Sequence, residues 1–182
     1  MRTNKKIILT AILLALLIIL SRFLSIKTPI VKISFGFVPT MLCAVWLGPK
    51  WTILLNVLGD VIGATLFPTG SYFVGYTIST AVAALIYGLL LYKKESDSYK
   101  NLQFLIRLII SSTLVAIVSN MGLNNLWLAI TTGEAFWVLL GTRIVKQLVM
   151  IPIHVIVIFF LEKVTRSPFD KYVRNENEDV VE

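Results

Sequence analysis

The chain has 182 residues, of which 57% are hydrophobic and 15% are charged. Soluble domains average about 45–50% apolar residues, so this composition excludes an ordinary soluble protein. A membrane-spanning helix needs about 20 apolar residues, and six such helices would leave room only for short loops. The single cysteine, Cys43, excludes an internal disulfide. The net charge of +7 comes from basic residues in short loops, which we interpret as topology signals and not as a nucleic-acid site.

Six apolar segments predict an all-α integral membrane protein, a compact bundle of six transmembrane helices. They lie near residues 6–22, 35–47, 50–67, 72–92, 102–120 and 135–162. The first resembles a signal peptide, but no small-residue cleavage site follows it, so we expect a retained helix. The second contains Pro39 and is short, so we expect it to span with help from Leu24–Ser34. Pro29 interrupts that segment, which allows it to fold back as a structured loop shielded by protein. Residues 1–165 thus form one membrane domain, and 166–182 a cytoplasmic tail, disordered at its end.

The basic residues predict the orientation of this bundle. Three of them, Arg22, Lys27 and Lys32, fall in loops at one end. Eleven fall at the other end: Arg2, Lys5, Lys6, Lys50, Lys93, Lys94, Lys100, Lys163, Arg166, Lys171 and Arg174. Since positive residues accumulate on the cytoplasmic side, both termini are expected in the cytoplasm.

Full charges interrupt these apolar segments, among them Asp60, Arg143 and Lys146. A charge at the centre of a bilayer costs roughly 2.5–3.5 kcal/mol, so each needs a partner, water or a function. Counting about 1.5 Å per residue from the outer ends of their helices places all three in the outer half of the membrane. We therefore expect one shared pocket that opens to the outside.

Helical spacing supports this pocket on two segments. In the last segment one face carries residues at offsets of 3, 4, 7 and 11 from the first: Arg143, Lys146, Gln147, Met150 and His154. In the third segment one face carries Asn56, Asp60, Gly63 and Phe67. Polar faces of membrane helices turn toward the protein interior.

An alternative interpretation is an Asp60–Arg143 ion pair that only locks two helices together. That pairing leaves Lys146 without a carboxylate, because Glu134 is expected at the mouth of the last helix. A second cation above Gln147 favours an anionic or amide-rich ligand. His154 and Met150 are interpreted as packing residues.

Aromatic and amide residues gather near the outer loops. They are Phe67, Tyr72, Phe73 and Tyr76 around one loop and Asn120, Asn124, Asn125 and Trp127 in the next. Single residues of these types are usually interfacial rings or turn formers. As a group, however, they suit a planar heterocycle, with rings for stacking and amides for its edge.

Several signatures of other functions are missing from the sequence. No phosphate-binding glycine loop is present, so ATP hydrolysis by this chain is not expected. No His/Cys cluster has metal-ligand spacing, and no nucleophile motif occurs, which makes an enzyme using Asp60 or His154 a remote alternative. No cofactor is expected. In the first helix, Ala11 and Ala15 are small residues four apart, a spacing that permits close approach of another helix.

These motifs together carry a resemblance. The Ala11–Ala15 pair in a small six-helix protein resembles the substrate-binding (S) components of energy-coupling factor (ECF) vitamin transporters. Three further stretches, Phe37–Leu42, Gly59–Ala64 with Phe67-Pro68, and Arg143–Gln147 with Met150 and Pro152, resemble the folate-specific S component. The resemblance covers most of residues 5–165.

The resemblance implies a transport function in the prokaryotic cytoplasmic membrane. Such proteins bind a vitamin from outside and associate with a membrane scaffold and two ATPase subunits, and ATP hydrolysis tips them to deliver it inward. By the same resemblance, Ala11 and Ala15 would face the scaffold, and Leu24–Val38 would act as a lid.

The polar residues also suit folate chemically. A carboxylate such as Asp60 would face the donor edge of the pterin. The linker needs apolar or aromatic walls, for which the candidates are Phe67, Tyr72, Tyr76 and Trp127, with Asn124 and Gln147 as amides. The two tail carboxylates would meet cations among Arg143, Lys146, Lys27 and Lys32, although Arg143 and Lys146 could instead face the pterin carbonyl. The alternatives are an S component for riboflavin, thiamine or pantothenate, and a purely structural subunit.

Overall fold

The computed structural model describes residues 3–27, 32–68, 72–92 and 101–178. Its elements in chain order are α1 (Thr3–Ile18), η1 (Ile19–Phe23), β1 (Ser25–Lys27), β2 (Lys32–Ser34), α2 (Phe37–Leu47), α3 (Pro49–Leu66), α4 (Val74–Leu91), α5 (Asn101–Val115), η2 (Ala116–Leu123), α6 (Asn124–Thr132) and α7 (Phe136–Glu178). The segments η1 and η2 are π-helical and continue the helices before them. Part of the predicted turn after Pro68, the polar break at 93–100 and the chain end at 179–182 lie outside the described residues.

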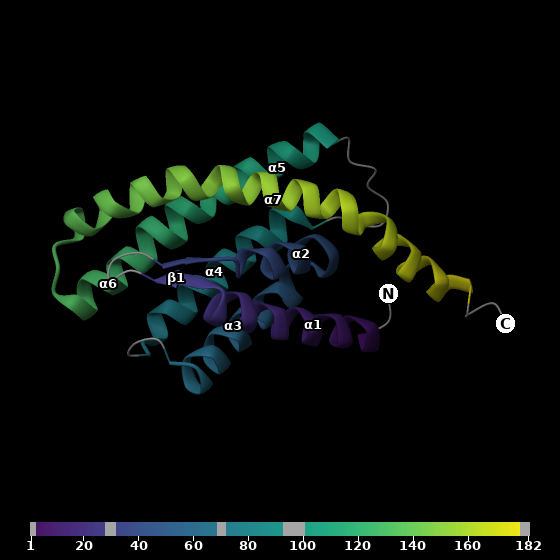
Figure 1. The fold of residues 1–182 in the computed structure, drawn as a ribbon, viewed down its shortest axis with the longest axis horizontal. Coiled ribbons are helices and arrows are strands. Elements are labelled where there is room, and N and C mark those ends of the chain that lie inside the picture. Colours follow the sequence, from purple (N-terminus) through teal and green to yellow (C-terminus); the bar gives the residue numbers. More distant parts are fainter. Residues whose placement is uncertain (1–2, 28–31, 69–71, 93–100, 179–182) are drawn as a thin grey trace.

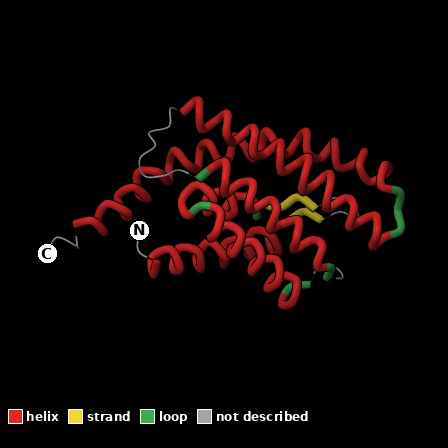
Figure 2. Tube along the Cα trace, turned by 180° about the vertical axis from the view of Figure 1, so that it is seen from behind, coloured by secondary structure: helices red, strands yellow, loops and turns green. Residues whose placement is uncertain are grey.

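Six continuous helical segments make up almost all of the described chain (Figures 1 and 2). Four are long and apolar enough to cross a membrane: Thr3–Phe23, Val74–Leu91, Leu102–Thr132 and Phe136–Thr165. The other two are the short apolar α2 and the 18-residue α3, which carries Asn56 and Asp60. The predicted helical membrane bundle is confirmed.

The turn predicted at Gly48-Pro49 separates α2 from α3. Gly48 has φ +80°, a left-handed conformation that L-residues rarely adopt, and Pro49 occupies the first turn of α3, where its missing N–H costs no hydrogen bond. Beyond this turn α3 and α4 pack tightly. A Cβ on Gly88 would overlap the Pro49 backbone, so the glycine permits the close crossing.

Buried apolar side chains form two clusters toward the end of the bundle where α4 ends and α5 begins. The larger draws on α2, α4, α5 and α7 and comprises Met41, Ala44, Val45, Tyr87, Leu91, Phe104, Leu108, Val115, Val155 and Ile158. The smaller places Leu13 and Leu17 of α1 against Cys43, Leu47 and Leu55. Leu148 and Val145 on the outer face of α7 are instead 69% and 65% exposed, as expected for side chains that meet lipid.

The connection after α1 contains a short antiparallel hairpin. β1 pairs with β2 in the register Ser25↔Ser34, Ile26↔Ile33 and Lys27↔Lys32. The described parts of Leu24–Ser34 therefore fold back as a structured connection, as the sequence allowed, and do not extend a membrane helix. Pro29, expected to interrupt this segment, lies outside the described residues. The role of this connection as a lid stays a prediction.

Two helices extend further than predicted. The fifth segment continues through η2 and α6 to Thr132, so the expected loop around Asn120–Trp127 is wrong. The last helix, α7, reaches Glu178, so most of the expected tail is helical, and disorder at the very end stays a prediction. Figure 1 shows the start of α1 and the end of α7 at the same end of the bundle. Their cytoplasmic location also stays a prediction.

Candidate ligand-binding site

The polar stripe of α7 turns into the bundle, as predicted. Gln147 and Met150 are 4% and 6% exposed, and Arg143, Lys146 and His154 are partly buried. The apolar residues between them cover the outer face of the helix. The direction of the stripe therefore follows from helical periodicity, because lipid takes the apolar face and protein the polar face.

Arg143 is held by the backbone of the fifth segment. Its Nη1 donates to the carbonyl oxygen of Asn120 at 3.1 Å. Asn120 lies in the π-helical segment η2. In a π-helix each carbonyl accepts from the N–H five residues later, and this wider turn leaves some carbonyls available to other donors. The side chain of Asn120 accepts from Asn124 Nδ2 at 3.3 Å. The buried Nε of Arg143 has no hydrogen-bond partner within the described part of the chain, so this guanidinium retains a donor for a ligand.

Lys146 and His154 continue the stripe below Arg143. Lys146 is three residues after Arg143 and His154 is eight residues after Lys146, so both lie on the same face of α7 as Arg143. The His154 ring stacks on Phe37 of α2, with ring centroids 4.0 Å apart. His154 is thus a packing residue, as interpreted from the sequence.

Asp60 on α3 is bound to α4 and not to α7. Its Oδ2 accepts a hydrogen bond from Thr77 Oγ1 at 2.6 Å, and the Tyr72 hydroxyl lies 2.9 Å from the same Thr77 oxygen. Neither Asp60 nor Arg143 forms an ion pair with the other in the described structure, so the two charges do not lock the helices. Asp60 Oδ1 has no hydrogen-bond partner among the described residues.

An aromatic cluster joins α4 to α6 beside Thr77. The Phe73 ring lies 5.7 Å from that of Trp127 and 6.0 Å from that of Tyr76. Trp127 Nε1 donates to Ser79 Oγ at 3.0 Å, which fixes the indole. The hydroxyls of Tyr76 and Thr131 are 3.5 Å apart. The cluster therefore ties α6 to the part of α4 that holds Asp60.

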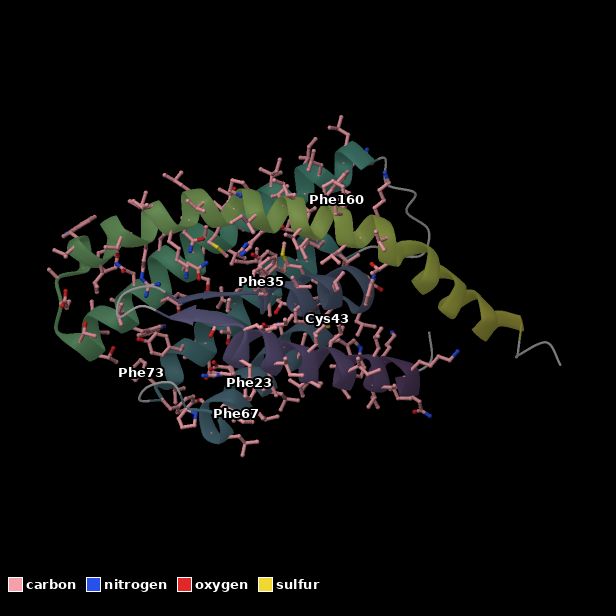
Figure 3. The ribbon with its side chains drawn as sticks, viewed as in Figure 1. Phe23, Phe35, Cys43, Phe67, Phe73 and Phe160 are labelled. Carbon is pink, nitrogen blue, oxygen red and sulfur yellow. The ribbon has the colours of Figure 1, made fainter. Side chains whose placement is uncertain are left out.

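Phe67 lies apart from this cluster, at the outer end of α3. Its ring meets the edge of Phe23 at 5.2 Å (Figure 3). Arg22 Nη1 donates to the Phe67 carbonyl at 3.5 Å, and a Cβ on Gly63 would meet the same guanidinium at 2.6 Å. Phe67 thus belongs to a contact between the ends of α1 and α3.

The remaining predicted residues fall in two places. Lys27 and Lys32 face each other in the hairpin register, and their side chains lie outside the described part. Ala11 and Ala15 are exposed on α1, whereas Leu13 and Leu17 turn inward. A group of three metal-ligand side chains does not occur among the described residues.

Sequence reasoning missed Thr77 and Ser79, which hold Asp60 and Trp127. It also missed Phe37, which holds His154. Thr and Ser hydroxyls that bond to their own helix are common in membrane segments, so nothing in the sequence distinguishes Thr77 and Ser79 from the others.

Comparisons with known proteins identify the family to which this fold and sequence are similar. A family model described as "ECF transporter, substrate-specific component" matches residues 5–162. The folate transporter FolT of Clostridium novyi is 39% identical over 159 residues, which is 87% of this chain and 88% of that protein. The folate transporter FolT of Leuconostoc mesenteroides subsp. mesenteroides is 36% identical, over 87% of this chain and 84% of its own. A crystal structure of FolT bound with folic acid superposes with a TM-score of 0.76 and 34% identity, and covers 86% of this chain and 92% of that one.

Proposed function

This chain belongs to the substrate-specific (S) components of ECF transporters, and from that premise we propose that it binds folate from outside the cell. It is a multi-pass protein of the prokaryotic cell membrane and a transport component, not an enzyme. The folate is then delivered inward when the chain couples to a separate membrane scaffold and two ATPase subunits.

One arrangement carries the proposal: a carboxylate, an aromatic cluster and an inward arginine come from different helices, and α4 contacts both the carboxylate and the cluster. Asp60 has an open oxygen, Trp127 and Phe73 provide flat apolar surface, and Arg143 has an unused donor. These groups match the three parts of folate: the donor edge of the pterin, the aromatic linker and the anionic tail. The folic acid bound by a relative of the same fold supports this ligand.

Two placements of the tail follow from the positions of the cations. In one, Arg143 and Lys146 meet the two tail carboxylates. In the other, they face the pterin carbonyl, and Lys27 and Lys32 on the hairpin meet the tail. In both, Asp60 faces the amino and ring N–H groups of the pterin, since a carboxylate only accepts hydrogen bonds.

A titration of the purified chain in detergent against folate, riboflavin, thiamine and pantothenate tests the substrate. We expect folate to bind with a dissociation constant in the nanomolar range, about −12 kcal/mol, and the other three vitamins to bind far more weakly. Tight binding of one of the other vitamins instead of folate would assign the chain to a different substrate.

Coupling is tested separately, at the surface of α1. Ala11 and Ala15 are exposed beside Ile8 and Ile12, so they offer a flat apolar face to a partner helix. Ala15→Trp is expected to abolish folate uptake by cells that supply the partner subunits, while the isolated chain keeps its folate affinity. Loss of both uptake and folate affinity would indicate misfolding. Val164→Trp is the matched control, because Val164 is 70% exposed on α7.

A further inference from the structure

The Thr77 hydroxyl behaves unlike that of most threonines on these helices. Thr10, Thr52 and Thr165, for example, donate to the carbonyl four residues earlier in their own helix. Such local bonds are the usual solution for a hydroxyl in an apolar helix. Thr77 instead donates across the α3–α4 interface to Asp60 Oδ2 at 2.6 Å.

The hydroxyls of Tyr72 and Thr77 and the carboxylate of Asp60 form a short chain of hydrogen bonds, and the number of protons on these groups decides which group donates in each bond. A threonine hydroxyl has one proton, and Thr77 gives it to the Asp60 carboxylate. The Tyr72 hydroxyl, 2.9 Å from the Thr77 oxygen, must therefore be the donor in that contact. The relay thus runs from Tyr72 to Thr77 to Asp60, and both hydroxyl protons are used within it.

We propose that Thr77 is a positioning residue that fixes the orientation of the Asp60 carboxylate and thereby selects ligands with a 2-amino group. This inference rests on the proposed function. With Oδ2 held by Thr77, the carboxylate cannot rotate freely, and Oδ1 is left for the ligand. A 2-amino-4-oxo pyrimidine ring presents adjacent N–H donors to such a carboxylate.

The same relay rejects rings with an oxygen at that position. A 2,4-dioxo ring would place an acceptor against Asp60, and neither Thr77 nor Tyr72 has a proton left to offer. An unpaired polar group in a buried site discriminates strongly between otherwise similar ligands. The relay therefore distinguishes the 2-amino-4-oxo ring of a pterin from the dione ring of a flavin.

The test titrates folate and its 2-deamino-2-oxo analogue against the purified full chain and four variants. Thr77→Val keeps the shape of the side chain and removes the hydroxyl, Thr77→Ser restores it, and Tyr72→Phe removes the first donor. Thr80→Val on the same helix is the matched control, because the Thr80 hydroxyl donates only to the Thr77 carbonyl of its own helix. Circular dichroism and thermal unfolding report whether each variant is folded.

We expect Thr77→Val to bind folate about tenfold more weakly, which is the effect of losing one hydrogen bond to a charged group. Its preference for folate over the analogue should shrink by a similar factor. Thr77→Ser should recover the wild-type preference. Tyr72→Phe should lower the preference for folate over the analogue about threefold.

Three other results would overturn the inference. An unchanged preference in Thr77→Val, whether both affinities stay the same or weaken equally, would show that Thr77 does not orient Asp60 for the 2-amino group. If Thr77→Val does not fold, an unchanged preference in Tyr72→Phe overturns the relay instead. If the wild-type chain binds no folate at all, the proposed function fails together with the relay.

Discussion

The helices α4 and α7 each pass through two regions of different character. Near Tyr72–Thr77 and Arg143–Gln147 their inner faces are polar and joined by hydrogen bonds between helices. Near Tyr87–Leu91 and Val155–Ile158 the inner faces of the same helices are apolar and closely packed. We infer that the apolar region sets the stability of the bundle and the polar region its ligand, so changes in the two regions should separate these properties.

The largest effect is expected in the polar region, from Asp60→Asn. The amide can still accept from Thr77, but it presents N–H donors to the donor edge of the ligand. Folate binding should weaken by about 1.5–3 kcal/mol, measured by isothermal titration. Glu134→Gln, at an exposed acid, is the control and should change little. An unchanged dissociation constant in folded Asp60→Asn would remove Asp60 from the site.

In the apolar region, Leu108→Ala should have the opposite pattern. Leu108 is 0% exposed, so its truncation leaves a cavity in the larger cluster. We expect a loss of about 2 kcal/mol in the free energy of unfolding, the lower end for buried leucines, because unfolded membrane helices remain in lipid. Leu102→Ala, at a leucine 65% exposed on the same helix, should cost far less. Weakened folate binding by folded Leu108→Ala would contradict the separation.

Gly88→Ala tests the crossing of α3 and α4, which connects the two regions. The new methyl group would overlap the Pro49 backbone and force the helices apart. We expect a loss of about 1.5 kcal/mol in stability, measured by thermal unfolding in detergent. Gly141→Ala is the control, because a Cβ there meets nothing within 4 Å. Equal stability of the two variants would show that the crossing is not tightly constrained.

The smallest effect is expected from Trp127→Phe. Phenylalanine keeps a ring beside Phe73 but loses the indole N–H that donates to Ser79 at 3.0 Å. Folate affinity should fall by about 0.5–1.5 kcal/mol, measured by titration. Trp137→Phe, where the tryptophan is 78% exposed, should leave the affinity unchanged. A larger loss than that of Asp60→Asn would place the ring, and not the carboxylate, at the centre of recognition.

Hydropathy predicted the helices well because each helix that crosses the membrane must present a long apolar surface to lipid. It also predicted that the α7 stripe turns inward, since charge avoids lipid. The extension through Asn124 and Asn125 was missed because asparagines usually mark turns. Here hydrogen bonds hold their amide nitrogens inside the helix: Asn124 Nδ2 donates to Asn120 Oδ1 one turn earlier, and Asn125 Nδ2 donates to the Phe136 carbonyl at 3.0 Å.

The sequence indicates the charges of the candidate site but not the contacts that support them. Asp60 and Arg143 stand out because charge in an apolar segment is costly. Thr77 does not stand out, since its partner belongs to another helix and only the crossing of α3 and α4 brings them together. The partner of Arg143 is a backbone carbonyl, which has no signature in the side-chain sequence.

The π-helical segment η2 has a consequence for how this chain tolerates changes in length. Each residue that a wide turn adds rotates the helix beyond it by about 100° relative to an uninterrupted α-helix. The phase of η2 therefore decides whether Trp127 points at Phe73 or out into the membrane. Removing a single residue from Ala116–Leu123 would rotate all of α6, even though every remaining side chain is unchanged. Replacing an exposed residue of the segment, such as Val118, should matter little.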